Sequence, residues 1–122
     1  MIDNYFSQFN KIIQQTDFII SSEIGMRKVN AFLGIIKGQV ILQSGILDIL
    51  EVIRIKEERV LKKKYKYHFR KTDDALIFRY DNVPHHRDIE TFPHHKHLAD
   101  GSVIASQEPD LLQVLLEIKE IE

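Results

Sequence analysis

The chain contains no cysteine and has only three prolines and five glycines among its 122 residues. Without cysteine it forms no disulfide, no thiolate–zinc site and no cysteine nucleophile, which fits the reducing cytoplasm where we expect the protein to act. No apolar run is long enough to cross a bilayer, and the N-terminus lacks the basic region of a secretory signal, so we expect no membrane partner. No glycine-rich phosphate loop is present, which argues against a nucleotide-using transferase.

The composition is that of an ordinary globular domain, with 43% apolar and 29% charged residues. We therefore expect a single domain over residues 1–122. The net charge of −1 hides an asymmetry along the chain. Residues 59–100 carry 10 basic and 6 acidic side chains, a net +4, whereas residues 101–122 carry 1 basic and 5 acidic side chains, a net −4. The positive segment predicts a local anion-binding face on a near-neutral molecule.

Hydrophobic spacing predicts a helix at each end of the chain and strands between them. Apolar residues recur at helical spacing between positions 5 and 13, where Asp3 is the expected cap, and again between 111 and 118, where Pro109 suits a first helical position. Residues 18–27, 29–43, 46–56, 60–70 and 75–81 are predicted to be strands. Residues 83–106 are expected to be irregular, because two X-Pro bonds disfavour helix there.

No connection between the predicted strands is long enough for a crossover helix, so they should form an antiparallel meander. We therefore predict an α+β fold, in which a sheet of about five strands carries the N-terminal and C-terminal helices on one face. A tight turn in the last hairpin would place Tyr67 opposite Phe78 and Lys66 beside Arg79.

The fourth predicted strand alternates between aromatic and basic residues. Tyr65, Tyr67 and Phe69 should point into the core, which leaves a basic face opposite. Cations on alternate residues lie about 6.6–6.8 Å apart, a spacing that can follow nucleic-acid phosphates. The alternative is a solvated edge whose lysines block pairing with other sheets. The nucleic-acid-binding candidates are Lys62, Lys64, Lys66, His68, Arg70 and, from the next segment, Lys96.

Five of the six histidines lie within the thirteen residues 85–97, which also contain Pro93. Imidazoles can take a proton from the 2′-hydroxyl of RNA and return one to the leaving 5′-oxygen, while a cation stabilises the charge that develops on phosphorus. This composition favours metal-free cleavage of RNA. The catalytic candidates are His85, His86, His94, His95, His97, Arg79 and Asp81.

Two other interpretations of the histidines stay open. A divalent metal could be chelated by His94 and His97 or by His95 and His97, although the spacing matches no specific zinc signature, so no cofactor is expected to be required. Alternatively, imidazoles bonded to carboxylates such as Asp81 and Asp88 would simply hold the proline-containing loop in place.

Two neighbouring motifs occupy this part of the chain: Phe78-Arg79-Tyr80-Asp81-Asn82-Val83-Pro84-His85-His86 and Thr91-Phe92-Pro93-His94-His95-Lys96-His97. Together they resemble the TumE family, the toxins of small bacterial and archaeal type II toxin–antitoxin pairs. The resemblance extends from about residue 45 to the end of the chain. It implies a cognate antitoxin, TumA-like and with a helix-turn-helix fold, but no particular mechanism.

We interpret the chain as a toxin that acts on RNA, as a histidine-dependent endoribonuclease. The alternative is a non-enzymatic binding module whose basic face grips RNA, the ribosome or an acidic antitoxin segment. Both depend on the histidine-bearing segment and the basic strand face meeting in one concave patch. An open sheet also leaves an edge strand through which a homodimer can form.

Overall fold

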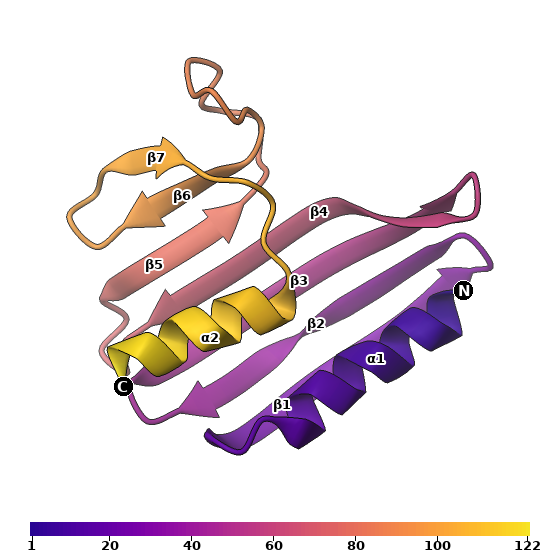
Figure 1. Cartoon of the computed structure of the whole chain (residues 1–122), viewed down its shortest axis with the longest axis horizontal. Coiled ribbons are helices and arrows are strands. Elements are labelled where there is room, and N and C mark those ends of the chain that lie inside the picture. Colours follow the sequence, from indigo (N-terminus) through magenta and orange to yellow (C-terminus); the bar gives the residue numbers. More distant parts are fainter.

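A computed structural model describes all 122 residues as one antiparallel sheet of seven strands with two helices (Figure 1). The strands lie in the sheet in chain order, so the predicted α+β meander is confirmed. Neither helix is long and apolar enough to cross a membrane. The elements are α1 (Ile2–Gln15), β1 (Ile19–Asn30), β2 (Leu33–Leu42), β3 (Gly45–Lys56), β4 (Arg59–Arg70), β5 (Leu76–Asp81), β6 (His95–Leu98), β7 (Val103–Ala105) and α2 (Leu111–Ile121).

The sheet has seven strands and not five, because β6 and β7 form within the segment expected to be irregular. Their sequences, four and three residues long, show no apolar alternation. They are strands because the backbone of β6 pairs with the edge of β5, and β7 then pairs with β6. Strands this short carry too little pattern to be predicted from sequence.

Both helices begin at a residue other than the predicted one. Helix α1 starts at Ile2, and Asp3 makes no capping bond but forms an ion pair with Lys28 at 3.1 Å. Helix α2 starts after Asp110, whose side chain accepts the Gln113 backbone N–H at 2.8 Å in a capping box. Residue 109 therefore precedes the helix and is not its first residue.

The register between β4 and β5 differs from the prediction by two residues. Tyr67 pairs with Tyr80, and Lys66 pairs with Asp81. The connection has five residues, 71–75, and the ladder is irregular after Phe69, so the turn is wider than the one assumed. An even shift keeps every side chain on its predicted face, and the aromatic face of β4 is buried as expected.

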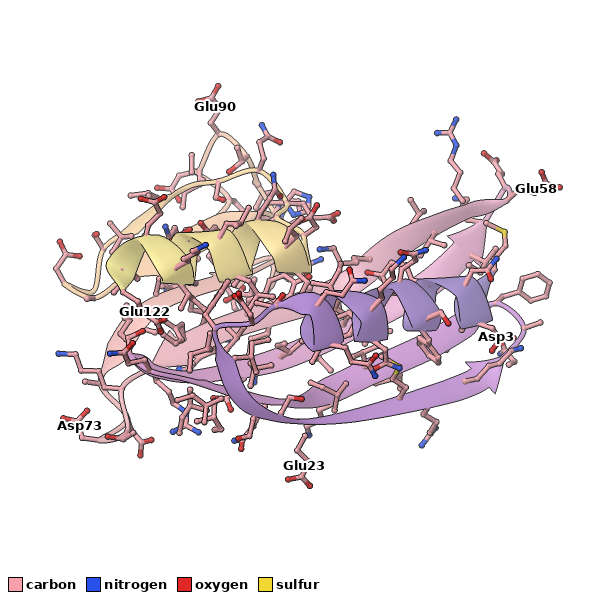
Figure 2. The ribbon with its side chains drawn as sticks, turned by 60° about the horizontal axis from the view of Figure 1, so that its bottom comes forward. Asp3, Glu23, Glu58, Asp73, Glu90 and Glu122 are labelled. Atoms are coloured by element: carbon pink, nitrogen blue, oxygen red, sulfur yellow. The ribbon has the colours of Figure 1, made fainter.

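Helices α1 and α2 cover the same face of the sheet, which we call the covered face (Figures 1 and 2). The core lies between them and this face, where Phe9 and Leu115 meet strand residues such as Val40 and Phe69. No element covers the opposite face, which we call the open face, and Glu23 projects from it in Figure 2. The sheet therefore presents one packed and one accessible surface, as antiparallel sheets commonly do.

Candidate functional site

The strand register places the predicted catalytic and basic residues side by side on the open face. Alternation along β4 and β5 buries the aromatic side chains and leaves the polar ones on this face. Pairing with β6 then adds two histidines. Two cross-strand rows result: His68, Arg79 and His97 form the first, and Lys66, Asp81 and His95 form the second.

Asp81 and His95 form the buried centre of this arrangement. Each residue is 2% exposed, and Asp81 Oδ1 lies 2.9 Å from His95 Nε2. The Nε2 atom of His97 lies 3.1 Å from His95 Nε2 and 3.4 Å from Asp81 Oδ2. His86 packs edge-on against both rings, with ring centroids 4.8 Å from His95 and 5.6 Å from His97. We call Arg79, Asp81, His86, His95 and His97 the histidine cluster.

The tautomer of His95 follows from its partners. Its Nδ1 lies 2.9 Å from the Pro93 carbonyl oxygen, which can only accept a hydrogen bond, so Nδ1 carries a proton in every charge state. Any proton that His95 gains or loses is therefore on Nε2. That nitrogen faces both Asp81 and His97, so a proton can be shared along these three groups.

Arg79 orients the carboxylate and keeps donors free. Its Nε donates to Asp81 Oδ2 at 2.8 Å, while the Val83 backbone N–H donates to Asp81 Oδ1 at 3.0 Å. The two Nη groups of Arg79 form none of the hydrogen bonds within the chain, and the side chain is 34% exposed. The guanidinium is thus placed to hold an anion beside the imidazoles.

The cluster lowers the basicity of its accessible imidazole. Partial burial lowers the pKa of His97 below its ordinary value, helped by the neighbouring His95, Arg79 and His86 and opposed by Asp81. Burial, with Arg79 next to it, also lowers the pKa of His68. Both rings are therefore neutral at pH 7 and able to accept a proton.

Three imidazoles of the histidine cluster lie close enough together to bind one divalent transition metal ion. One ligand atom from each of His86, His95 and His97 lies within 4.8 Å of the others. Of the two chelating pairs considered from the sequence, only His95 with His97 is brought together. His94 is separated from them, because it lies on the other face.

Three of the candidate residues lie on the covered face instead of the open one. The His94 ring stacks on Tyr65 and its Nδ1 is 2.9 Å from the Tyr65 hydroxyl. Lys96 forms an ion pair with Glu117 of α2 at 2.7 Å. Lys62 was expected on the basic face. Val52 pairs with Lys64 and the next residue, Ile53, pairs with Lys62, so residue 63 forms a bulge. The bulge reverses the alternation of β4 and turns Lys62 to the covered face.

The remaining cations of the open face differ in availability. Lys64 and Lys66 take part in none of the ion pairs. Arg70, by contrast, pairs with Asp48 at 2.7 Å and with Asp74 at 2.9 Å. His85 is exposed in the loop before β6 and has no side-chain partner there. Among the candidate residues, the free positive charge of this face therefore comes from Lys64, Lys66 and the Arg79 donors.

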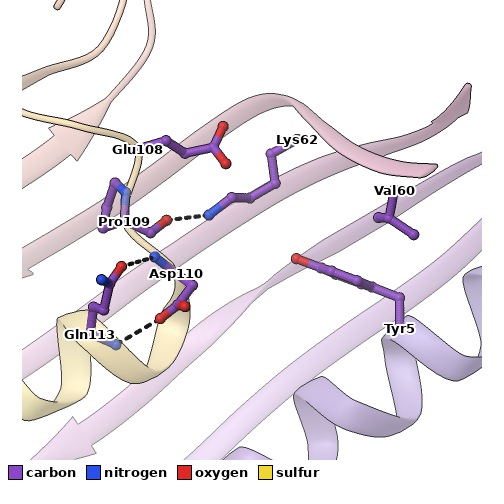
Figure 3. Close-up of a pocket in the computed structure, with 7 residues that line it drawn as sticks. All are labelled: Tyr5, Val60, Lys62, Glu108, Pro109, Asp110 and Gln113. Atoms are coloured by element: carbon purple, nitrogen blue, oxygen red, sulfur yellow. Dashed lines mark hydrogen bonds between the residues drawn. The ribbon is translucent and has the colours of Figure 1, made fainter.

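Lys62 lies at the wall of a cavity of about 280 Å³ that the sequence did not predict (Figure 3). Its Nζ donates to the Tyr67 hydroxyl at 2.7 Å and to the Pro109 carbonyl oxygen. The Tyr67 hydroxyl donates in turn to Glu51, which is 1% exposed and also accepts from Tyr5. The sequence does contain a signal for this buried polar site, because Glu51 is an acidic residue at a core-facing position of the alternating strand β3.

Comparison with known proteins gives one match. The family model described as Toxin TumE matches residues 9–122 of this chain, which includes nearly every element of the fold and both histidine motifs. No curated protein and no solved structure matches. Membership of a toxin family implies a cognate antitoxin, in agreement with the expectation from the sequence motifs.

Proposed function

The chain belongs to the TumE toxin family, and from the chemistry of its open face we propose that this toxin acts on RNA as a metal-independent endoribonuclease. The observation that carries the proposal is the chain of short contacts from Asp81 through His95 Nε2 to His97 Nε2, at 2.9 and 3.1 Å. A buried carboxylate that orients one imidazole beside a second is an arrangement suited to proton transfer. Arg79 adds the cation that a phosphodiester reaction requires.

The reaction we propose is transesterification within the RNA strand. His97, whose pKa is lowered, removes the proton of the 2′-hydroxyl. The 2′-oxygen then attacks phosphorus, the bond to the 5′-oxygen breaks, and His86 gives its proton to that leaving oxygen. The products are a 2′,3′-cyclic phosphate and a 5′-hydroxyl. The Nη groups of Arg79 hold the charge on the phosphate oxygens during the step.

Asp81 and His95 act as positioning residues in this scheme. At 2% exposure neither reaches the substrate, whereas the His97 side chain is 28% exposed. His95 fixes the orientation of the His97 ring and links that ring to the negative charge of Asp81. Lys64 and Lys66, which lack carboxylate partners, bind the flanking phosphates of the strand.

The implied antitoxin is expected to cover the same face. A partner that neutralises Lys64, Lys66 and Arg79 should present acidic side chains there, and its binding should weaken as salt is raised. We propose a TumA-like protein with a helix-turn-helix fold in this role. Separately, two copies of the toxin can pair through the edge strand β1 or β7 to form a homodimer.

The proposal is tested with purified toxin and a 5′-labelled single-stranded RNA, in the presence and absence of EDTA. We expect cleavage that survives EDTA, yields cyclic phosphate ends and is lost in His97→Ala and His86→Ala. The matched control is His85→Ala, which removes an exposed imidazole adjacent in sequence and should leave the rate unchanged.

Two results would contradict this mechanism. Cleavage that stops in EDTA, returns with Zn²⁺ or Mn²⁺ and leaves 5′-phosphate ends would assign the cluster to a metal. Toxicity that survives His97→Gln and His86→Gln but not charge reversal at Lys64 and Lys66 would make the protein a binding module without catalysis.

A further inference from the structure

We infer that a second cavity, at the exposed edge of β4, binds one nucleotide of the RNA strand whose cleavage is proposed above, and the inference rests on that function. The cavity has a volume of about 440 Å³, within the range of small-ligand sites. Its polar lining includes Arg54, Lys56, Lys62, Lys63, Asn82 and His94.

The cavity exists because β4 is longer than its neighbour. The last residue of β5, Asp81, pairs with Lys66, whereas β4 begins seven residues earlier, at Arg59. Beyond Lys66 the outer edge of β4 therefore has no strand beside it, and Figure 1 shows β3 and β4 continuing past the end of β5. The bulge at Lys63 falls in this unpaired stretch.

The charge of the cavity favours an anion. Four lysine or arginine side chains line it, and Glu108 is its one carboxylate. Lys62 is half-buried, yet its Nζ is held by neutral oxygens and forms none of the ion pairs. Burial lowers the pKa of Lys62, and the carboxylates of Glu51, Glu108 and Asp110 oppose this effect. A phosphate in the cavity would be attracted by this side chain and by the three other cations.

The polar groups of the cavity are held in place before any ligand binds. Asn82 replaces the absent strand at the edge of β4: its side-chain oxygen accepts the Tyr65 backbone N–H at 3.0 Å, and its nitrogen donates to the Lys63 carbonyl at 3.1 Å. His94 is fixed by stacking and a hydrogen bond to Tyr65. A ligand therefore meets an ordered site with little ordering cost.

The cavity is connected to the histidine cluster along the surface. A neighbouring cavity of about 320 Å³ shares Lys63 and Asn82 with it and is also lined by Lys64, which faces the open side. Asn82 directly follows Asp81 of the cluster. A single strand can therefore cross the β4 edge beside the lysines, with one phosphate at the cluster and a neighbouring nucleotide in the cavity.

The test measures binding of a fluorescein-labelled RNA octamer by anisotropy, in a His97→Ala background that prevents cleavage. The pocket variant combines Arg54→Gln, Lys56→Gln and Lys63→Gln, all at exposed positions, so that folding is preserved. The control variant combines Lys11→Gln, Lys71→Gln and Lys119→Gln, which remove the same charge at exposed positions elsewhere. We expect the pocket variant to bind at least tenfold more weakly than the control.

A nucleoside 5′-monophosphate locates the site directly. In ¹H–¹⁵N spectra it should shift the Asn82 side-chain amide and the Lys63 backbone amide of the parent protein and not of the pocket variant. Equal weakening in both variants would overturn the inference, because the effect would then be one of overall charge. The inference would also be overturned if the pocket variant kept RNA binding but lost binding of a glutamate-rich decapeptide. That result would identify an acidic protein segment as the occupant of the cavity.

The two proposals fail in different ways. A protein that binds the octamer through the cavity but leaves RNA intact refutes the nuclease alone. Cleavage with unchanged KM in the otherwise wild-type pocket variant refutes the cavity alone, since a substrate-binding role must raise KM. Absence of any RNA binding refutes both.

Discussion

Asp81 and His95 are paired residues of neighbouring strands, each 2% exposed, with Asp81 Oδ1 lying 2.9 Å from His95 Nε2. The carboxylate also accepts from Arg79 and from the Val83 backbone, so a single buried group orients both an imidazole and a guanidinium. Removal of this group should therefore disturb Arg79, His95 and the nearby His97 together.

Asp81→Asn should lower the rate of RNA cleavage at least tenfold, equivalent to about 1.4 kcal/mol of transition-state stabilisation. The amide keeps the shape of the carboxylate but loses the charge that orients Arg79 and His95. The measurement is kcat/KM on a synthetic RNA, and Asp88→Asn in the exposed loop is the matched control. A variant as active as the control would show that the Asp81 charge is unimportant for the reaction.

Charge reversal at Lys64 and Lys66 should weaken RNA binding and reduce its salt dependence. Each phosphate contact to a single strand contributes a slope of about 0.7 in a plot of log K against log salt, so the loss of two contacts should reduce the slope by about 1.4. Titrations at several salt concentrations give this value, with Lys11→Glu as control. An unchanged slope would place the RNA elsewhere.

Stability should rise with pH through the histidine range. The pKa values of His68 and His97 are lowered from 6.5 in the folded protein, so the unfolded chain binds more protons between the lowered values and about 6.5. The two histidines therefore leave the free energy of unfolding undiminished above about pH 6.5. As the pH falls through this interval, their protonation lowers the free energy of unfolding. Urea unfolding should show that the free energy of unfolding changes less between pH 5 and pH 7.5 in His68→Gln than in the parent protein.

Tyr67→Phe should destabilise the fold by roughly 1–3 kcal/mol, because it leaves the buried Glu51 carboxylate with one partner fewer. It also removes an acceptor from Lys62. Tyr80→Phe is the natural comparison, since its hydroxyl bonds to the more accessible Glu117 and should cost less. Denaturant unfolding of both variants decides the order, and equal losses would contradict the special role of the buried carboxylate.

The fold could be predicted from the sequence where the pattern is long. Strands of ten or more residues with alternating burial, such as β3 and β4, and the helix carrying Val114 and Ile118 were found from hydrophobic period alone. The number of strands and the β4–β5 register were wrong. A strand of three or four residues has no measurable period, and the register depends on the shape of a turn whose residues permit several lengths.

The amino-acid order by itself determined which chemistry the molecule can perform, since it supplies imidazole, arginine and aspartate in one short segment and no thiol anywhere. Only the tertiary structure decided which of these groups meet. Pairing of β6 with the β5 edge brings His95 and His97 to Asp81, while the alternation of a pleated strand turns His94 to the opposite face. The backbone hydrogen bonds of that pairing join residues more than ten positions apart, and no local pattern encodes them.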